Sequence, residues 1–259
     1  MSEELKGYTA LITGGSSGLG YEMAKALLGR GATVIIAARG RERLEKARAS
    51  LTEIGDAHAV AVDVRDAASV EAAADWFRGR FPRLDMLVCG AGIGNNAPGM
   101  DSLPPEHAFW EIPAEAVRAV LETNLLGFFL VSSRFAPLME RGGRLVYVST
   151  SDATMTRPGQ LPYGPSQAGA EAMAALLAQE LKGRGIAVNV ICPGGFTDTN
   201  MAPPGAKERM LEAGLPVLPP TVLNEVILYL ASPASAGLTG QKLVGKDFAR
   251  WLAERNGSE

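Results

Sequence analysis

The glycine-rich stretch Thr13–Gly20, of sequence TGGSSGLG, is the first feature of the chain that suggests ligand chemistry. Glycine lets the backbone turn sharply and lets a ligand approach without a Cβ in the way. An apolar run ending at Ile12 predicts a buried strand before the turn, and the amphipathic segment Leu19–Leu28 predicts a helix after it. The free N–H groups at the start of such a helix suit a pyrophosphate. A tight turn without a ligand could also use these glycines, but the second apolar strand that soon follows favours a dinucleotide site.

Apolar strand patterns alternate with helical patterns along all 259 residues. The predicted strands are Thr9–Thr13, Thr33–Ala38, His58–Val62, Met86–Cys89, Arg144–Ser149, Ala187–Ile191 and Lys242–Val244. The predicted helices are Leu19–Leu28, Arg41–Ile54, Ala67–Arg80, Ala114–Met139, Tyr163–Lys182 and Val222–Leu230. Most strands are continuous apolar runs, so helices should cover both faces of the sheet. The pattern predicts an α/β fold, a single-domain Rossmann-type doubly wound parallel β-sheet spanning residues 1–259.

Two irregular stretches, Gly94–Pro113 and Phe196–Pro220, each follow a predicted strand. Ligands of such sheets bind at the carboxyl ends of the strands, and loops of this length are usually functional or disordered. We therefore expect both stretches to border a substrate, although surface excursions without a function would read the same way. Their apolar side chains favour a hydrophobic ring or acyl compound; these are Phe109, Trp110, Met201, Met210 and Leu211.

Composition and charge exclude several classes of function. The net charge is −3, which gives no reason to expect nucleic acid or an anionic membrane as a partner. We expect no membrane span and no signal peptide, and the two cysteines, Cys89 and Cys192, fit buried thiols in a reducing cytoplasm. With two histidines far apart and no Cys/His cluster, we expect no metal site.

Taken together, the motifs of this chain resemble those of the short-chain dehydrogenase/reductase family over essentially the whole length. The matching segments are Thr13–Gly20, Asp63-Val64, Gly90-Ala91-Gly92, Asn124, Tyr163 and Pro193-Gly194. Their order and spacing are specific as a set. The resemblance implies a nicotinamide cofactor, a small-molecule substrate, and a homotetramer or homodimer built from the helices Ala114–Met139 and Tyr163–Lys182.

The same resemblance assigns residues to the cofactor. They are Gly14, Ser16, Ser17, Gly18, Leu19, Gly20, Arg39, Asp63, Val64, Gly90, Ala91, Gly92, Tyr163, Gln167, Pro193, Gly194 and Thr199. An acidic residue after the second strand would accept from a ribose 2′-hydroxyl, but this chain has Arg39, followed by Arg41 and Arg43. A guanidinium suits a 2′-phosphate, so we expect NADP(H), although Arg41 or Arg43 could merely solvate a helix start. Asp63 is similar to the family's adenine-contacting acid, and could equally be a turn residue.

The resemblance also implies the catalytic residues Asn124, Thr150, Tyr163 and Gln167. In the family a Tyr transfers the proton, a Ser or Thr hydroxyl holds the substrate oxygen, and an Asn completes a water relay. A Lys four residues after the Tyr binds the nicotinamide ribose and lowers the pKa of the Tyr. Here that position is Gln167, and residues i and i+4 share one helix face. A neutral amide lacks the field that moves a tyrosine pKa from about 10 toward neutrality.

Three functions follow as alternatives. The first is an NADP(H)-dependent oxidoreductase that acts on a carbonyl or a secondary alcohol held by Thr150 and Tyr163. The second is a redox-neutral cyclase, isomerase or dehydratase on the same scaffold, with Asp152 or His107 as additional polar groups. The third is a non-catalytic NADP(H)-binding protein. The sequence does not identify the substrate.

Overall fold

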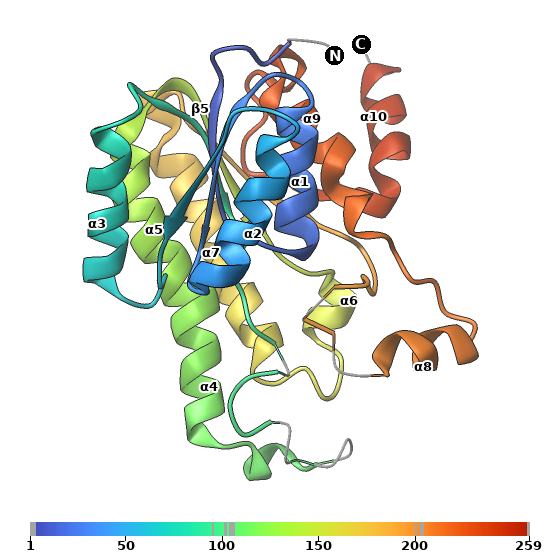
Figure 1. The fold of residues 1–259 in the computed structure, drawn as a ribbon. Coiled ribbons are helices and arrows are strands. Elements are labelled where there is room, and N and C mark those ends of the chain that lie inside the picture. Colours follow the sequence, from blue (N-terminus) through green and yellow to red (C-terminus); the bar gives the residue numbers. More distant parts are fainter. Residues whose placement is uncertain are drawn as a thin grey trace.

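A seven-stranded parallel sheet forms the centre of the molecule, with strand order β3-β2-β1-β4-β5-β6-β7 (Figure 1). The computed structural model describes residues 4–94, 96–100, 103, 107–199, 201–202 and 205–257. The strands are β1 Thr9–Thr13, β2 Thr33–Ala38, β3 Ala57–Ala61, β4 Leu84–Cys89, β5 Met139–Val148, β6 Ala187–Cys192 and β7 Lys242–Val244. The chain order reverses between β1 and β4, as in a Rossmann fold. The predicted single-domain, doubly wound α/β fold is confirmed.

Helices cover both faces of the sheet, because successive side chains of the buried strands point to opposite sides. The helices are α1 Gly18–Leu28, α2 Arg41–Thr52, α3 Ala67–Arg78, α4 Ala114–Leu121, α5 Gly127–Phe135, α6 Asp152–Met155, α7 Tyr163–Glu180, α8 Ala206–Glu212, α9 Asn224–Ala231 and α10 Phe248–Asn256. In β1, Ala10 and Ile12 pack with α1, α2, α9 and α10, whereas Leu11 packs with α3, α5 and α7. Figure 1 shows these two layers on either side of the strands.

The structure corrects the prediction of one continuous helix over Ala114–Met139. A π-helical segment, Glu122–Leu126, separates α4 from α5, and β5 begins at Met139 rather than at Arg144. A π-bulge in a helix is found most often at functional sites. Three helices, α6, α8 and α10, were not predicted, and two of them are short excursions within loops.

The run Ala114–Leu138 also has the length and mean hydropathy (1.3 over its most apolar window) of a membrane-crossing helix. Half of that window is buried inside the fold, and core helices of globular proteins have the same properties.

Candidate active site

A cavity of about 1520 Å³ lies along the carboxyl ends of β1, β2, β4, β5 and β6. It is lined by every predicted cofactor residue, from Gly14 to Thr199, and by Thr150. Residues that are far apart in the sequence meet there because the strands are parallel, so all their carboxyl ends reach one edge of the sheet. Of the predicted catalytic residues, Asn124 alone is outside the lining.

The glycine-rich turn packs against its own chain as well as facing the cavity. Gly14 has φ +73°, and a Cβ there would lie 2.6 Å from the carbonyl oxygen of Gly90. A Cβ at Gly20 would lie 2.5 Å from the carbonyl oxygen of Gly14. The N-cap residue of α1, Ser17, makes no side-chain capping bond, which leaves the start of this helix open to an anionic ligand.

Thr13 is a structural residue of the site that the sequence did not reveal. Its hydroxyl accepts hydrogen bonds from the backbone N–H groups of Gly90 (3.1 Å) and Ala91 (3.2 Å) and donates to the carbonyl of Val88 (3.3 Å). One buried side chain thereby joins the carboxyl ends of β1 and β4 and shapes the floor of the cavity.

One end of the cavity is rich in arginine. Arg39, Arg41 and Arg43 line it and are exposed, and they make no side-chain hydrogen bond or ion pair with the described part of the chain. Asp63 is instead engaged: Arg65 donates to its two carboxylate oxygens at 2.7 to 3.3 Å. These bonds hold the pKa of Asp63 below its ordinary value. The expected contact between Asp63 and an adenine stays a prediction, and Arg65 was not among the predicted residues.

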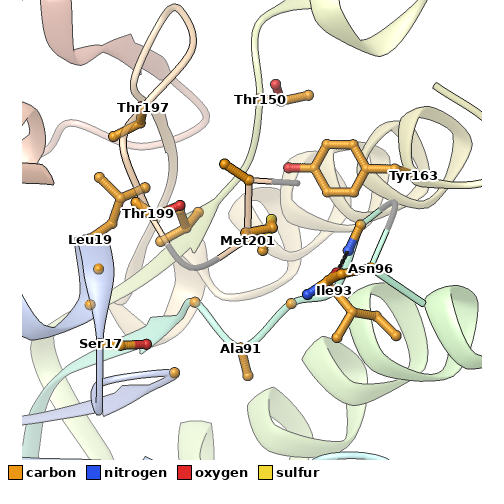
Figure 2. Close-up of a pocket in the computed structure, with 18 of the residues that line it drawn as sticks. Ser17, Leu19, Ala91, Ile93, Asn96, Thr150, Tyr163, Thr197, Thr199 and Met201 are labelled. Atoms are coloured by element: carbon orange, nitrogen blue, oxygen red, sulfur yellow. Dashed lines mark hydrogen bonds between the residues drawn. The ribbon is translucent and has the colours of Figure 1, made fainter. Parts of the chain in front are cut away.

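Tyr163 and Gln167 meet at the other end of the cavity, on the first turns of α7. The amide Nε2 of Gln167 donates to the phenol oxygen of Tyr163 at 3.0 Å. In Figure 2 the phenol oxygen points into the cavity, with Thr150 on one side and Met201 on the other. Burial raises the pKa of Tyr163, and hydrogen bonding with Gln167 and Thr150 only partly offsets this rise.

Asn124 lies in the π-helical segment behind the cavity and is fully buried. Its side chain accepts from the N–H of Ile93 (2.9 Å) and donates to the carbonyl of Ile93 (2.8 Å) and to the hydroxyl of Ser166 (3.0 Å). Ser166 in turn donates to the carbonyl of Tyr163 at 2.6 Å. Asn124 therefore ties the end of β4 to the start of α7, which positions Tyr163. Its expected part in a water relay remains a prediction.

Lys242 does not take the place of the missing lysine. Its ammonium binds Asp152 (2.5 Å) and Glu171 (2.8 Å), and Glu171 also accepts from the hydroxyl of Ser149 (2.5 Å). The three charged residues of this cluster act on the buried thiol of Cys192 and do not line the cavity, whereas Ser149 does. Asp152 and His107, weighed as polar groups of a redox-neutral site, are not lining residues either.

The segment after β6 crosses the cavity. A Cβ at Gly18 would lie 3.2 Å from Thr199 Cγ2, and one at Gly94 would lie 3.7 Å from both Met201 Cγ and Tyr163 Cδ2. Further along, Met210, Leu215 and other residues of this segment line one wall; they include Phe196, Thr197, Ala202, Ala206, Arg209 and Pro216. In Figure 2 Thr199 lies between Leu19 and Met201.

The other irregular stretch, Gly94–Pro113, borders the cavity only at Gly94 and Asn96 among its described residues. Phe109 and Trp110, expected near a substrate, are 67% and 75% exposed and pack against each other instead. Parts of both stretches lie outside the described residues, among them residues 101–102 and 203–204.

The two cysteines are separate buried thiols, and the described residues contain no group of His, Cys, Asp or Glu arranged to hold a metal ion.

Comparison with known proteins identifies the family. The model of the short chain dehydrogenase family matches residues 8–209. The chain is 32% identical over 252 residues to 3-oxoacyl-(acyl-carrier-protein) reductase FabG of Thermotoga maritima, covering 94% of this chain and 97% of the relative. It is 33% identical over 193 residues to 2-dehydro-3-deoxy-L-rhamnonate dehydrogenase (NAD(+)) of a Sphingomonas species, covering 73% of this chain and 72% of the relative.

Its structure is similar to that of a short chain dehydrogenase from Burkholderia cenocepacia solved in complex with NADP, with a TM-score of 0.81 and 28% identity over 93% of this chain and 97% of that chain. The family model covers most of the chain, and the Thermotoga maritima relative covers 94% of it. The chain belongs to the short-chain dehydrogenase/reductase family.

Proposed function

We propose that this protein is an NADP(H)-dependent oxidoreductase that reduces a carbonyl compound, or oxidises the matching secondary alcohol, in the cytoplasm. The observation that carries the proposal is the position of the Tyr163 phenol. It projects into the same cavity as the glycine-rich turn, beside Thr150, with Gln167 bound to its oxygen at 3.0 Å. A buried phenol next to a hydroxyl can hold a carbonyl oxygen and give it a proton.

The residues present fit NADP(H). The open N-terminus of α1 suits the pyrophosphate, and Arg39, with Arg41 and Arg43, suits the 2′-phosphate. Arg39, Arg41 and Arg43 make no ion pair with a described carboxylate, although the charge of Arg39 acts on Asp63, and three like charges at one place favour an anionic ligand. The solved structure from Burkholderia cenocepacia, in complex with NADP, supports the same cofactor.

The substrate end of the cavity favours a compound with an apolar body. Met201, Met210 and Leu215 line it, all from the segment after β6. Thr150 and Tyr163 supply polar groups to the same cavity, and Figure 2 shows Met201 beside the Tyr163 ring. When bound, the cofactor supplies hydride, so Thr150 must orient the carbonyl oxygen and Tyr163 must donate to it.

The test is the oxidation of NADPH, followed by absorbance, with a panel of apolar ketones and aldehydes. Tyr163→Phe should lower kcat about 100-fold to 10,000-fold, because the proton donor is lost while the ring remains. Tyr21→Phe is the matched control. Tyr21 lies on α1, outside the cavity lining, and its hydroxyl donates to Ser50 of α2, so its loss should leave kcat unchanged.

Two outcomes would contradict the proposal. Turnover of a substrate at constant NADPH absorbance would indicate a redox-neutral enzyme. NADPH binding with no turnover, and with Tyr163→Phe indistinguishable from the unaltered protein, would indicate a non-catalytic binding protein.

A further inference from the structure

The amide of Gln167 has two ends with different surroundings. The side chain is buried, with the residue 5% exposed, and it belongs to the cavity wall. Its Nε2 donates a hydrogen bond to the phenol oxygen of Tyr163. Its Oε1 is buried and has no hydrogen-bond partner in the described part of the chain. A buried acceptor without a partner is costly, so such an atom in a cavity wall indicates a ligand that donates to it.

Among the described residues, none of the groups that shift the pKa of Tyr163 is a cation. Cys192, at the end of β6, faces the phenol, and burial raises the pKa of this thiol to about 11, so it is neutral at physiological pH. The charged groups behind Cys192 are Lys242, Glu171 and Asp152, and the single ammonium is bound by the two carboxylates. Their summed charge does not favour a tyrosinate.

We propose that Tyr163 stays a neutral phenol through the neutral and mildly alkaline range because Gln167 puts no cation beside it, while the free carbonyl oxygen of Gln167 accepts a hydrogen bond from a ribose hydroxyl of the cofactor. A lysine at this position would present donors only, so the glutamine reverses the polarity toward the ribose. The inference rests on the proposed function for the identity of the ligand, but the state of the phenol can be measured without any substrate.

In the reduction, the proton that the substrate oxygen gains then comes from the phenol of Tyr163. The hydride that bound NADPH would supply adds to the carbonyl carbon, which would leave NADP⁺. The O–H bond of Tyr163 breaks and its proton forms the O–H bond of the alcohol, which leaves a tyrosinate that regains a proton from water. In oxidation the tyrosinate must be present before the reaction begins.

This state of Tyr163 predicts a characteristic pair of pH profiles. Because burial raises the pKa of Tyr163 above its ordinary value of 10.0, reduction has its proton donor at every pH below that and should be independent of pH there. Oxidation should rise about tenfold per pH unit up to the same break, because only the tyrosinate can take the proton. The overall equilibrium sets the ratio of the two rates at each pH, so the position of the shared break is the informative quantity.

The first experiment titrates Tyr163 in the cofactor-free protein. Tyrosinate absorbance is measured against pH in the unaltered protein and in Tyr163→Phe, and the difference between the two curves reports Tyr163. We expect a midpoint above pH 10. Gln167→Lys should lower the midpoint by about one to three pH units, because an ammonium one helical turn away favours the tyrosinate. A midpoint near neutrality in the unaltered protein, or no shift in Gln167→Lys, would overturn the first half of the proposal.

The second experiment measures NADPH binding by fluorescence. Gln167→Met keeps the side-chain volume but removes both polar ends, and we expect it to weaken binding about threefold to tenfold. Gln179→Met, at an exposed position later on α7, is the matched control and should leave binding unchanged. Unchanged affinity in Gln167→Met would overturn the contact with the ribose.

Neither experiment needs a substrate. If no carbonyl compound is reduced but Tyr163 titrates and NADPH binds as expected, the proposed function fails and the assignment of Gln167 stands. If reduction occurs and its pH profile breaks near neutrality, the proposed function stands and the assignment of Gln167 fails.

Discussion

We expect the choice between NADP(H) and NAD(H) to depend on Arg39. This residue follows β2, lines the cavity, and makes no hydrogen bond or ion pair in the described residues, although its charge acts on Asp63, which Arg65 binds. We expect Arg39→Asp to weaken NADPH binding about tenfold to 100-fold, because a bond between charged groups is lost and a like charge is added. NADH binding should improve, since the new carboxylate can accept from a free ribose 2′-hydroxyl.

Fluorescence titration with both cofactors measures this prediction. Arg48→Asp is the control, because Arg48 lies on α2, outside the cavity lining, and pairs with Glu45. An unchanged ratio of the two affinities in Arg39→Asp would show that the 2′-phosphate is recognised elsewhere, with Arg41, Arg43 and Arg65 as the nearest candidates.

The π-helical segment Glu122–Leu126 contains Asn124, whose hydrogen bond to Ser166 holds the start of α7 and thereby positions Tyr163. Asn124→Ala would leave the N–H and C=O groups of Ile93 without partners and remove the bond to Ser166. We expect the free energy of unfolding to fall by about 2 to 5 kcal/mol, since each buried polar group left unpaired costs about 1 to 3 kcal/mol.

Denaturant unfolding measures that loss, and Ser133→Ala, which removes a bond from the half-buried Ser133 hydroxyl to the carbonyl of Leu130 on α5, is a milder control. If Asn124→Ala kept its full stability while losing activity, the residue would act in the chemistry directly, as the water-relay assignment expects, rather than through the position of α7.

At the scale of the whole molecule, several apolar side chains are exposed on the helices α4, α5 and α7. Leu121, Leu126 and Phe129, on α4, the π-helical segment and α5, are 37%, 43% and 52% exposed, and Leu176 on α7 is 60% exposed. Leu121, Leu126 and Phe129 line a hollow together with Glu122, Leu125 and Met173. Apolar side chains gathered in this way on neighbouring helices are typical of an interface. They support the homotetramer or homodimer that the family resemblance implies for these helices.

Phe129→Glu should therefore dissociate the assembly, because a charge would be buried opposite its own symmetry mate in a two-fold interface. Light scattering coupled to size-exclusion chromatography would show a smaller particle. Leu211→Glu is the control, because Leu211 is similarly exposed (58%) but lies on α8, away from these helices. An unaltered protein that is already monomeric at micromolar concentration would refute the assembly.

The sequence by itself determined the sheet and the nucleotide end of the site. The continuous apolar strands, the turn Thr13–Gly20 and Arg39 are local signals: each depends on residues that are neighbours in the chain. Helix geometry alone also placed Gln167 next to Tyr163, four residues apart, and the 3.0 Å bond confirms that placement.

Only the tertiary structure decided what surrounds those residues. The side chain of Asn124 bonds Ile93 and Ser166, Thr13 joins two strands, and Lys242 pairs with carboxylates from α6 and α7; all of these contacts bridge distant parts of the chain. The break of Ala114–Leu138 at a π-helical segment and the exposure of Phe109 and Trp110 likewise follow from packing, which hydrophobic periodicity does not encode. Whether a cation lies near Tyr163 depends on three-dimensional distance. In the folded protein the ammonium of Lys242 pairs with Asp152 and Glu171 instead.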